Sequence, residues 1–257
     1  MERQTILTVS HLQKYYGARE NVTRAIDDLS FTVEKGEFVG IMGASGSGKT
    51  TLLNCVATID RPTAGHITIG GADVTALRRG ALAKFRRERL GFVFQDCNLL
   101  DTLTAFENIA LALTILRTPA GEIEPRVRET AALLGISNCL KKYPYQLSGG
   151  ERQRTAAARA IITRPDLVLA DEPTGALDSK SARLLLERFE ALNAEQGATI
   201  LMVTHDAFTA SYCHRILFIK DGRLFTELNR GSDGRKVFFE RILEVVTLLG
   251  GDAGDVL

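Results

Sequence analysis

A glycine-rich segment carries the residues whose types and spacing point most directly to chemistry. Gly43–Thr50 reads Gly-Ala-Ser-Gly-Ser-Gly-Lys-Thr and matches G-x-x-x-x-G-K-[ST] at every fixed position. Glycines let a backbone bend until successive N–H groups point inward at phosphate oxygens. We predict that Lys49 reaches the β- and γ-phosphates of a nucleotide and that Thr50 binds Mg²⁺. The residues predicted to bind the nucleotide phosphates are Gly43, Ala44, Ser45, Gly46, Ser47, Gly48, Lys49, Thr50 and Thr51.

The flanking residues decide between this prediction and an ordinary glycine turn. The apolar run Phe38–Met42 precedes the loop and is predicted to be a strand, and Thr50–Thr58 is predicted to be a helix. The phosphate-binding pattern requires this strand–loop–helix context, because the positive end of the helix then faces the anion. The context therefore favours nucleotide binding.

Two carboxylates follow another apolar run. Leu167–Ala170 is predicted to be a buried strand, and Asp171 and Glu172 come directly after it. We predict that Asp171 holds the Mg²⁺ shell and that Glu172 polarises the attacking water. An acidic pair after a strand is more often a helix start, which Pro173 would suit. The phosphate-binding loop elsewhere in the chain makes the catalytic interpretation the stronger one.

Two single residues occupy similar positions. Gln95 ends the predicted strand Leu90–Phe94, and His205 follows the predicted strand Thr199–Thr204. Each alone would usually be an ordinary loop residue, but α/β proteins bind ligands at the carboxyl ends of core strands. We therefore predict that Gln95 contacts the metal and the bound water and that His205 contacts the γ-phosphate.

Composition and charge exclude several other classes. The chain has 257 residues, of which 45% are hydrophobic and 25% charged, as in soluble globular proteins. A formal net charge of +1 gives no reason to expect a nucleic-acid partner. Four widely spaced cysteines suit reduced thiols rather than zinc or disulfides. We expect no signal peptide, and no apolar stretch approaches the ~18 residues of a membrane span.

The remaining periodicity predicts elements that position these residues. A helical block from about Asp101 to Thr163 is inserted into a core of strands that is expected to be mainly parallel. A polar loop is expected over Gly17–Thr23, and an Asp221-Gly222 turn joins two late strands. The other predicted strands and helices are Ile6–Leu12, Ala25–Val33, His66–Ile69, Ser179–Glu195, Arg215–Lys220 and Arg223–Glu227.

A second helix start carries the residues that identify a family. Leu147–Glu151 reads Leu-Ser-Gly-Gly-Glu and directly precedes a helix predicted over Arg152–Ile162, so its serine and glycines form another anion-binding helix start. Together with the phosphate loop and the acidic pair, it resembles the signature of the ABC-type ATPases. The resemblance implies an α/β P-loop core of mainly parallel sheet, with an antiparallel β subdomain and an inserted helical subdomain.

The resemblance also implies a site shared between two copies of the chain. The phosphate loop of one copy would face the signature of the other, so that ATP is bound between them. The residues that would act in trans are Leu147, Ser148, Gly149, Gly150 and Glu151. Asp178 would communicate between the two sites, and Tyr16 would stack on adenine. The sequence alone leaves Tyr15 as an alternative to Tyr16.

Further stretches resemble the ATPases of bacitracin-type (Bce-type) peptide-antibiotic exporters, within the wider lipoprotein-release and macrolide-efflux group. These stretches are Phe92–Asn108, Tyr143–Gln146, Ala170–Lys180, Phe208–Cys213 and Phe218–Leu224. The resemblance implies an ATP-hydrolysing subunit at the cytoplasmic face of the membrane. A separate permease, and through it a sensor kinase, would be the partners. The alternatives are a lipoprotein-release or macrolide-efflux ATPase, or a mainly regulatory ATPase that controls the kinase.

The same resemblance predicts one ABC ATPase domain over residues 1–257. The core and β subdomain would cover about 1–96 and 164–227, the helical subdomain 97–163, and a C-terminal helical extension 233–250. The basic run Leu77–Arg89 is interpreted as a solvated helix face, with lipid headgroups or the permease as the alternative. A soluble ABC ATPase of DNA repair or translation is disfavoured, because neither a long heptad-rich insertion nor a second ATPase unit is visible.

Overall fold

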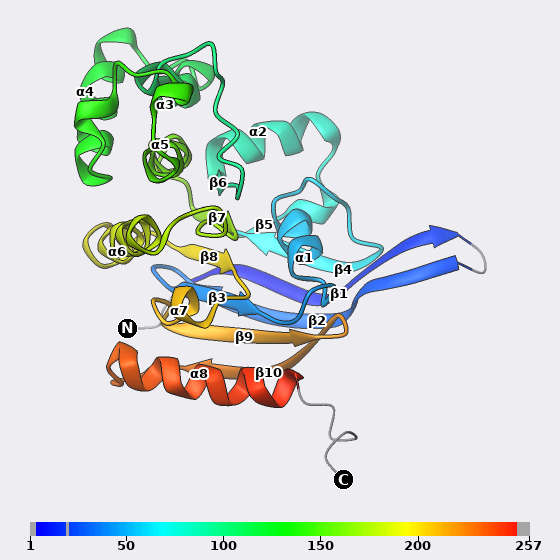
Figure 1. Ribbon diagram of the computed structural model, residues 1–257. Coiled ribbons are helices and arrows are strands. Elements are labelled where there is room, and N and C mark those ends of the chain that lie inside the picture. The colour runs from blue at the N-terminus through cyan, green and yellow to red at the C-terminus, as the bar shows by residue number, and fades with distance from the viewer. Residues whose placement is uncertain (1–3, 19–20, 251–257) are drawn as a thin grey trace. The chain divides into compact units, whose positions relative to one another are not determined.

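The computed structural model describes residues 4–18 and 21–250 (Figure 1). Their contacts define two compact units, one formed by the chain up to Leu77 and from Leu201 onward, the other by Arg78–Ile200. The helical subdomain predicted over 97–163 falls within the second unit. The predicted division into subdomains remains a prediction, and its residues 1–3 and 251–257 lie outside the described part of the chain.

The first unit contains an antiparallel sheet of order β2-β1-β4-β5. It is formed by β1 (Thr5–Ala18), β2 (Asn21–Glu34), β4 (Ala64–Ile69) and β5 (Ala72–Asp73). Buried and exposed residues alternate in the second half of β2, as expected for a sheet with one solvated face. The predicted antiparallel β region is thus present, and its strands are longer than the sequence suggested.

The polar loop predicted over Gly17–Thr23 is wrong. Tyr16 pairs with Thr23, and Gly17 pairs with Val22, so both strands continue into this segment (Figure 1). Residues 19–20 of the predicted loop lie outside the described part. The first four residues of β2 are all exposed, so polar side chains there face solvent without interrupting the strand. The polar residues of this segment therefore indicate exposure to solvent rather than a loop.

A second set of strands in this unit supports the phosphate loop. The fully buried β3 (Phe38–Met42) pairs in parallel with β9 (Arg215–Lys220), which pairs antiparallel with β10 (Arg223–Asn229). On the other side of β3 lies β8 (Ile200–Val203). The predicted Asp221-Gly222 turn is confirmed, since both residues have the positive φ angles that a tight hairpin requires. The remaining elements of the unit are α1 (Lys49–Val56), η1 (Val74–Ala76), α7 (Ala207–Ala210) and α8 (Arg235–Gly250).

The second unit pairs a short parallel ribbon with helices (Figure 1). Its elements are α2 (Arg79–Arg89), β6 (Leu90–Val93), α3 (Ala105–Ile115), α4 (Ala120–Leu133), η2 (Ser137–Cys139), η3 (Pro144–Gln146), α5 (Gly149–Ile161), β7 (Leu167–Asp171) and α6 (Ser179–Gln196). The predicted helical block is therefore confirmed as α3, α4 and α5, separated by turns. On the basic helix α2, Leu82 and Phe85 are buried while most cationic side chains are exposed, which supports the solvated-face interpretation.

None of the helices in the described ranges, 4–18 and 21–250, has the length and apolar character needed to cross a lipid bilayer.

Arg215 at the start of β9 links several strands of the first unit. Its guanidinium donates two hydrogen bonds to the Glu37 carboxylate, at 2.7 and 3.1 Å, beside the start of β3. It also donates to the carbonyl oxygen of Thr32 in β2 and to the Glu227 carboxylate in β10. Only 15% of the Arg215 side chain is exposed. Removal of the guanidinium would leave the Glu37 carboxylate and the Thr32 carbonyl without a donor that they now share.

We predict that Arg215→Met lowers the free energy of unfolding by about 3 kcal/mol, because a largely buried guanidinium that bonds to Glu37, Thr32 and Glu227 is lost. Arg223→Met is the matched control, because Arg223 also pairs with a carboxylate, Asp27, but 67% of its side chain is exposed. It should cost less than about 1 kcal/mol. Urea unfolding of both variants measures the difference. Equal losses would show that the Arg215 cluster does not hold the strands together.

Candidate functional site

The phosphate loop connects β3 to α1 through backbone conformations that only glycine adopts easily. Gly46 and Gly48 have φ angles of +78° and +101°. A side chain on Gly48 would collide with the carbonyl oxygen of Ala25, and one on Gly43 would collide with that of Ile219. The glycines of the pattern thus permit both the turn and its close approach to neighbouring strands.

The polar groups of this loop are directed inward. Lys49 is 7% exposed, and its Nζ donates hydrogen bonds to the carbonyl oxygens of Gly43 and Ala44, at 2.8 and 2.7 Å. Ser47 is 6% exposed, and its hydroxyl has no hydrogen-bond partner among the described residues. A buried hydroxyl without a partner is costly. A bound oxoanion would accept hydrogen bonds from the Ser47 hydroxyl and from the Lys49 ammonium.

The helix behind the loop is prepared for an anion. No side chain caps the N-terminus of α1, and its first turn contains no acidic residue. The side chains of Thr104, Ser148 and Asp178 cap α3, α5 and α6, whereas α2 and α4, like α1, have no side-chain cap; of these three, only α1 follows a glycine loop of this kind. The first N–H groups and the dipole of an uncapped helix attract phosphate.

The geometry favours Tyr16 over Tyr15 as the aromatic residue beside this loop. Tyr16 is 41% exposed, and its hydroxyl donates to Asp60 at 2.6 Å. The Thr51 side chain also lies within hydrogen-bond reach of that hydroxyl, which places Tyr16 next to the first turn of α1. Tyr15 instead bonds to Gln13 and Asp27.

His205 follows β8, the strand beside β3, which leads into the phosphate loop. The preceding Thr204 N–H donates to the carbonyl oxygen of Ile41, two residues before Gly43. His205 is exposed. The predicted residues of the first unit therefore gather at one end of β3.

Within the second unit, the structure brings Gln95 and the acidic pair together. Asp171 ends β7 and Gln95 follows the neighbouring strand β6. The Gln95 side-chain nitrogen is 3.0 Å from the position that a Cβ on Gly175 would occupy, and the Gly175 N–H donates to the Glu172 carbonyl. Glu172 has a φ of +43°, which is unusual for a residue with a side chain. Backbone strain of this kind is common at functional positions.

The signature residues differ from prediction in one respect. The helix predicted to begin at Arg152 begins at Gly149, with Ser148 as its N-cap. The reason is a capping box, in which the Glu151 N–H donates to the Ser148 hydroxyl and the Ser148 N–H donates to the Glu151 carboxylate. Glycines have low helix propensity, so the sequence hid the first turn. Gly150 packs against Ser181 of α6, while Ser148 is exposed.

Asp178 has a clear local role. Its carboxylate accepts hydrogen bonds from the backbone N–H groups of Lys180 and Ser181, both at 3.0 Å, and so caps α6. Hydrogen bonds from the side chain and backbone of Ser181 lower the pKa of Asp178. It is exposed, and the structure of one copy leaves its predicted role between two sites a proposal.

Sequence reasoning missed several residues that support the predicted ones. Lys14 and Asp60 fix Tyr16, because Lys14 lies 4.6 Å from the ring centroid and pairs with Asp60 at 2.7 Å. Cys139 and Lys142 contact Glu151 of the signature. Only the position of Cys139 and Lys142 shortly before the signature could have indicated them. Of the four cysteines, Cys55, Cys139 and Cys213 are buried, whereas Cys97 is partly exposed.

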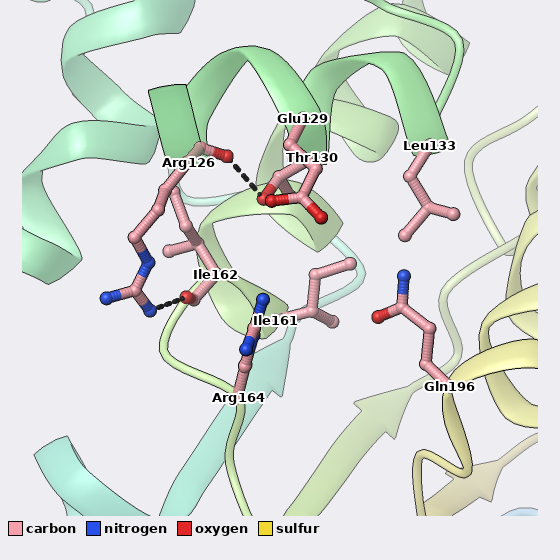
Figure 2. A pocket seen from close by; sticks show the side chains of 8 residues that line it. All are labelled: Arg126, Glu129, Thr130, Leu133, Ile161, Ile162, Arg164 and Gln196. Carbon is pink, nitrogen blue, oxygen red and sulfur yellow. Dashed lines mark hydrogen bonds between the residues drawn. The ribbon is translucent and has the colours of Figure 1, made fainter. Parts of the chain in front are cut away.

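The pocket drawn in Figure 2 is lined by none of the predicted site residues. It is lined by Arg126, Thr130, Leu133, Arg164 and Gln196, among others, and has a volume of about 30 Å³. This is room for about one water molecule rather than a nucleotide. Residues 4–18 and 21–250 contain no cluster of three or more His, Cys, Asp or Glu that could hold a metal ion by themselves. Mg²⁺ rarely has such a cluster when it binds with a nucleotide.

Comparisons with known proteins agree with this geometry. Residues 26–175 match the family model of the ABC transporter. The chain is 52% identical to the ABC transporter ATP-binding protein YxdL of Bacillus subtilis, over 98% of this chain and 97% of that protein. It is 49% identical to the bacitracin export ATP-binding protein BceA of Halalkalibacterium halodurans, over 97% and 99%.

A solved structure extends the comparison to the fold. The ATP-binding cassette MJ0796 of Methanocaldococcus jannaschii was described as dimeric, in a post-hydrolysis state and bound to ADP and Pi. Its structure superposes on this chain with a TM-score of 0.79 at 37% sequence identity. The superposition covers 87% of this chain and 98% of MJ0796. A glycine loop before an uncapped helix, a capped signature helix and these similarities agree: the chain belongs to the ABC transporter family, as one of its ATP-binding proteins.

Proposed function

We propose that this chain binds and hydrolyses ATP to power a separate membrane permease that removes or exports peptide antibiotics. The observation that carries the proposal is the glycine loop before α1, which turns Lys49 and the buried Ser47 hydroxyl inward at a helix start that no side chain caps. A helix start behind such a loop is a phosphate-binding arrangement. Membership of the family supports ATP hydrolysis. The peptide-antibiotic substrate is proposed in addition, from the similarity to one relative.

Each predicted residue then has a role that its chemistry supports. Lys49 would exchange its bonds to Gly43 and Ala44 for bonds to the β- and γ-phosphates. Glu172 would orient the attacking water and accept its proton, and His205 would hold the γ-phosphate. The Thr50 hydroxyl, the Asp171 carboxylate and the Gln95 amide offer the hard oxygen ligands that Mg²⁺ requires. When bound, Mg²⁺ would neutralise charge on the phosphates.

The signature supports a site completed by a second copy. Ser148 is exposed at a helix N-terminus, where its hydroxyl and the glycine N–H groups can meet a phosphate from outside the chain. Solved relatives of this fold are described as dimeric. We therefore assign Leu147–Glu151 to the nucleotide of a partner copy, Asp178 to communication between the two sites, and Tyr16 to stacking on adenine.

The similarity to a bacitracin export ATP-binding protein supports the substrate class, since that relative aligns over 97% of this chain. A permease would place the chain peripherally at the cytoplasmic face of the membrane. A sensor kinase that contacts the permease belongs to the same proposal.

We predict that Glu172→Gln lowers the rate of ATP hydrolysis by about 10²- to 10⁴-fold, because the amide cannot accept a proton from water. The affinity for ADP, measured by calorimetry, should change by less than about twofold, since Glu172 acts on water rather than on adenine. Glu195→Gln, at an exposed position of α6, is the control and should hydrolyse normally. Near-normal turnover by Glu172→Gln would remove Glu172 from its assigned role.

We predict that Ser148→Arg abolishes hydrolysis, by about 100-fold or more, because a bulky cation at the helix start prevents approach of the partner's nucleotide. Binding of ADP by the monomer should persist, since Ser148 is assigned to the partner's site. Ser232→Arg provides an exposed serine in the other unit as the control. Full activity of Ser148→Arg would contradict a site completed in trans.

The substrate class is tested in cells of the source organism. We expect the tagged chain to co-purify a permease from native membranes, and Lys49→Ala to sensitise cells to bacitracin-like peptides by about tenfold or more, because transport loses its ATP binding. Sensitivity to macrolides should not change. A permease that co-purifies while peptide sensitivity is unchanged would leave the ATPase assignment intact and overturn the peptide-antibiotic assignment.

A further inference from the structure

The signature helix depends on a carboxylate whose two oxygens have separate partners. One oxygen of Glu151, Oε2, accepts the Ser148 N–H at 2.7 Å and so closes the capping box. The other, Oε1, lies 2.9 Å from the sulfur of Cys139. A carboxylate held at both oxygens cannot rotate away from the cap without breaking one of these bonds.

Cys139 reaches this carboxylate from inside the unit. It ends η2, before the signature in sequence, and is only 1% exposed. Lys142 approaches the same oxygen from the solvent side, at 3.5 Å, and 41% of its side chain is exposed. The thiol is therefore the buried partner of Oε1, and the ammonium is the exposed one, which contributes little because of solvent screening.

The protonation states give this contact its direction. The hydrogen bond from Cys139, followed by that from the Ser148 N–H, lowers the pKa of Glu151 to about 2. Burial, followed by the bond to Glu151, raises the pKa of Cys139 to about 11. At neutral pH the sulfur keeps its proton and donates it to a charged carboxylate, and hydrogen bonds to charged groups are the stronger ones.

We propose that Cys139 is a positioning residue for the signature: its thiol holds Glu151 in the capping box and thereby fixes Ser148 at the start of α5. The consequence for hydrolysis rests on the proposed function of Ser148. The consequence for the capping box does not, and it can be measured in the protein without nucleotide.

If Cys139 only packed against its neighbours, its substitutions would have different effects. If Cys139 only fills space, Cys139→Ser should be no better than Cys139→Ala, because both shorten the side chain and serine also buries a hydroxyl. If the donor matters, serine should restore what alanine loses, because its hydroxyl can donate to Oε1. The comparison between the two variants therefore separates a donor from a space-filling side chain.

The test is amide hydrogen exchange at Ser148 in the full-length protein, measured by NMR, because this N–H closes the capping box. We expect exchange to be about five- to tenfold faster in Cys139→Ala, since one hydrogen bond that restrains its acceptor is lost. Cys139→Ser should return it to within about twofold of the unsubstituted protein. Cys213→Ala, which removes another fully buried free cysteine, should leave Ser148 exchange unchanged.

Hydrolysis is measured on the same variants. We expect kcat to fall by about five- to tenfold in Cys139→Ala with ADP affinity unchanged, and to recover in Cys139→Ser. Unchanged Ser148 exchange in Cys139→Ala, or no recovery in Cys139→Ser, overturns the proposal. Altered exchange with unaltered hydrolysis would support the positioning of Ser148 and contradict its role in the reaction, which is the separate claim of the proposed function.

Discussion

The structure depends on the tight turn by which a glycine loop leads from β3 into the N-terminus of α1. The first turn of α1 has no capping side chain and no acidic residue, and the loop before it turns its lysine and a buried serine hydroxyl inward. The first N–H groups of a helix have no partner within the helix itself, and phosphate is a suitable acceptor for them. The strands around the loop serve this arrangement, because close approach by the carbonyls of Ala25 and Ile219 leaves no space for side chains on its glycines.

The signature helix α5 has a different kind of N-terminus from α1. Its N-terminus is capped from within by Ser148 and Glu151, and the carboxylate is held in turn by a buried thiol. A capped start keeps a defined backbone without a ligand, so it can present Ser148 to a group on another molecule. We propose that the start of α1 binds a nucleotide of its own chain and that the capped start of α5 contacts the nucleotide of a partner. We regard this division as the physical basis of the proposed dimer.

Much of the fold could be predicted because its strands and loops have strong local signals. The buried run Phe38–Met42, the Asp221-Gly222 turn and the helix at Ser179 all have residues that determine their own conformation. The predictions failed where the residue types favour a loop but the backbone forms a strand or a helix. The polar start of β2 lies on an exposed strand, and the glycines of the signature form a first helical turn that a capping box stabilises.

The supporting residues of the site could not be predicted, either because they act across a long sequence separation, as Asp60 does, or because no sequence pattern marks them, as with Cys139 and Lys142. Asp60 accepts a hydrogen bond from Tyr16, 44 residues earlier, and the choice between Tyr15 and Tyr16 depends on it. The phosphate loop is formed by consecutive residues, so it can be recognised from its sequence pattern alone. Positioning depends on packing, which a pattern does not record.

The central claim is that the chain carries two halves of different sites, and nucleotide-dependent association tests it most directly. Sedimentation velocity of Glu172→Gln, which should retain unhydrolysed ATP, would be compared with that of the double variant Glu172→Gln/Ser148→Arg, each with and without Mg²⁺ and ATP. We predict a dimer only for Glu172→Gln with Mg²⁺ and ATP, and a monomer for the double variant even when it has bound ATP. A Glu172→Gln protein that stays monomeric while saturated with ATP, or a double variant that dimerises equally well, would show that two copies do not share the nucleotide site.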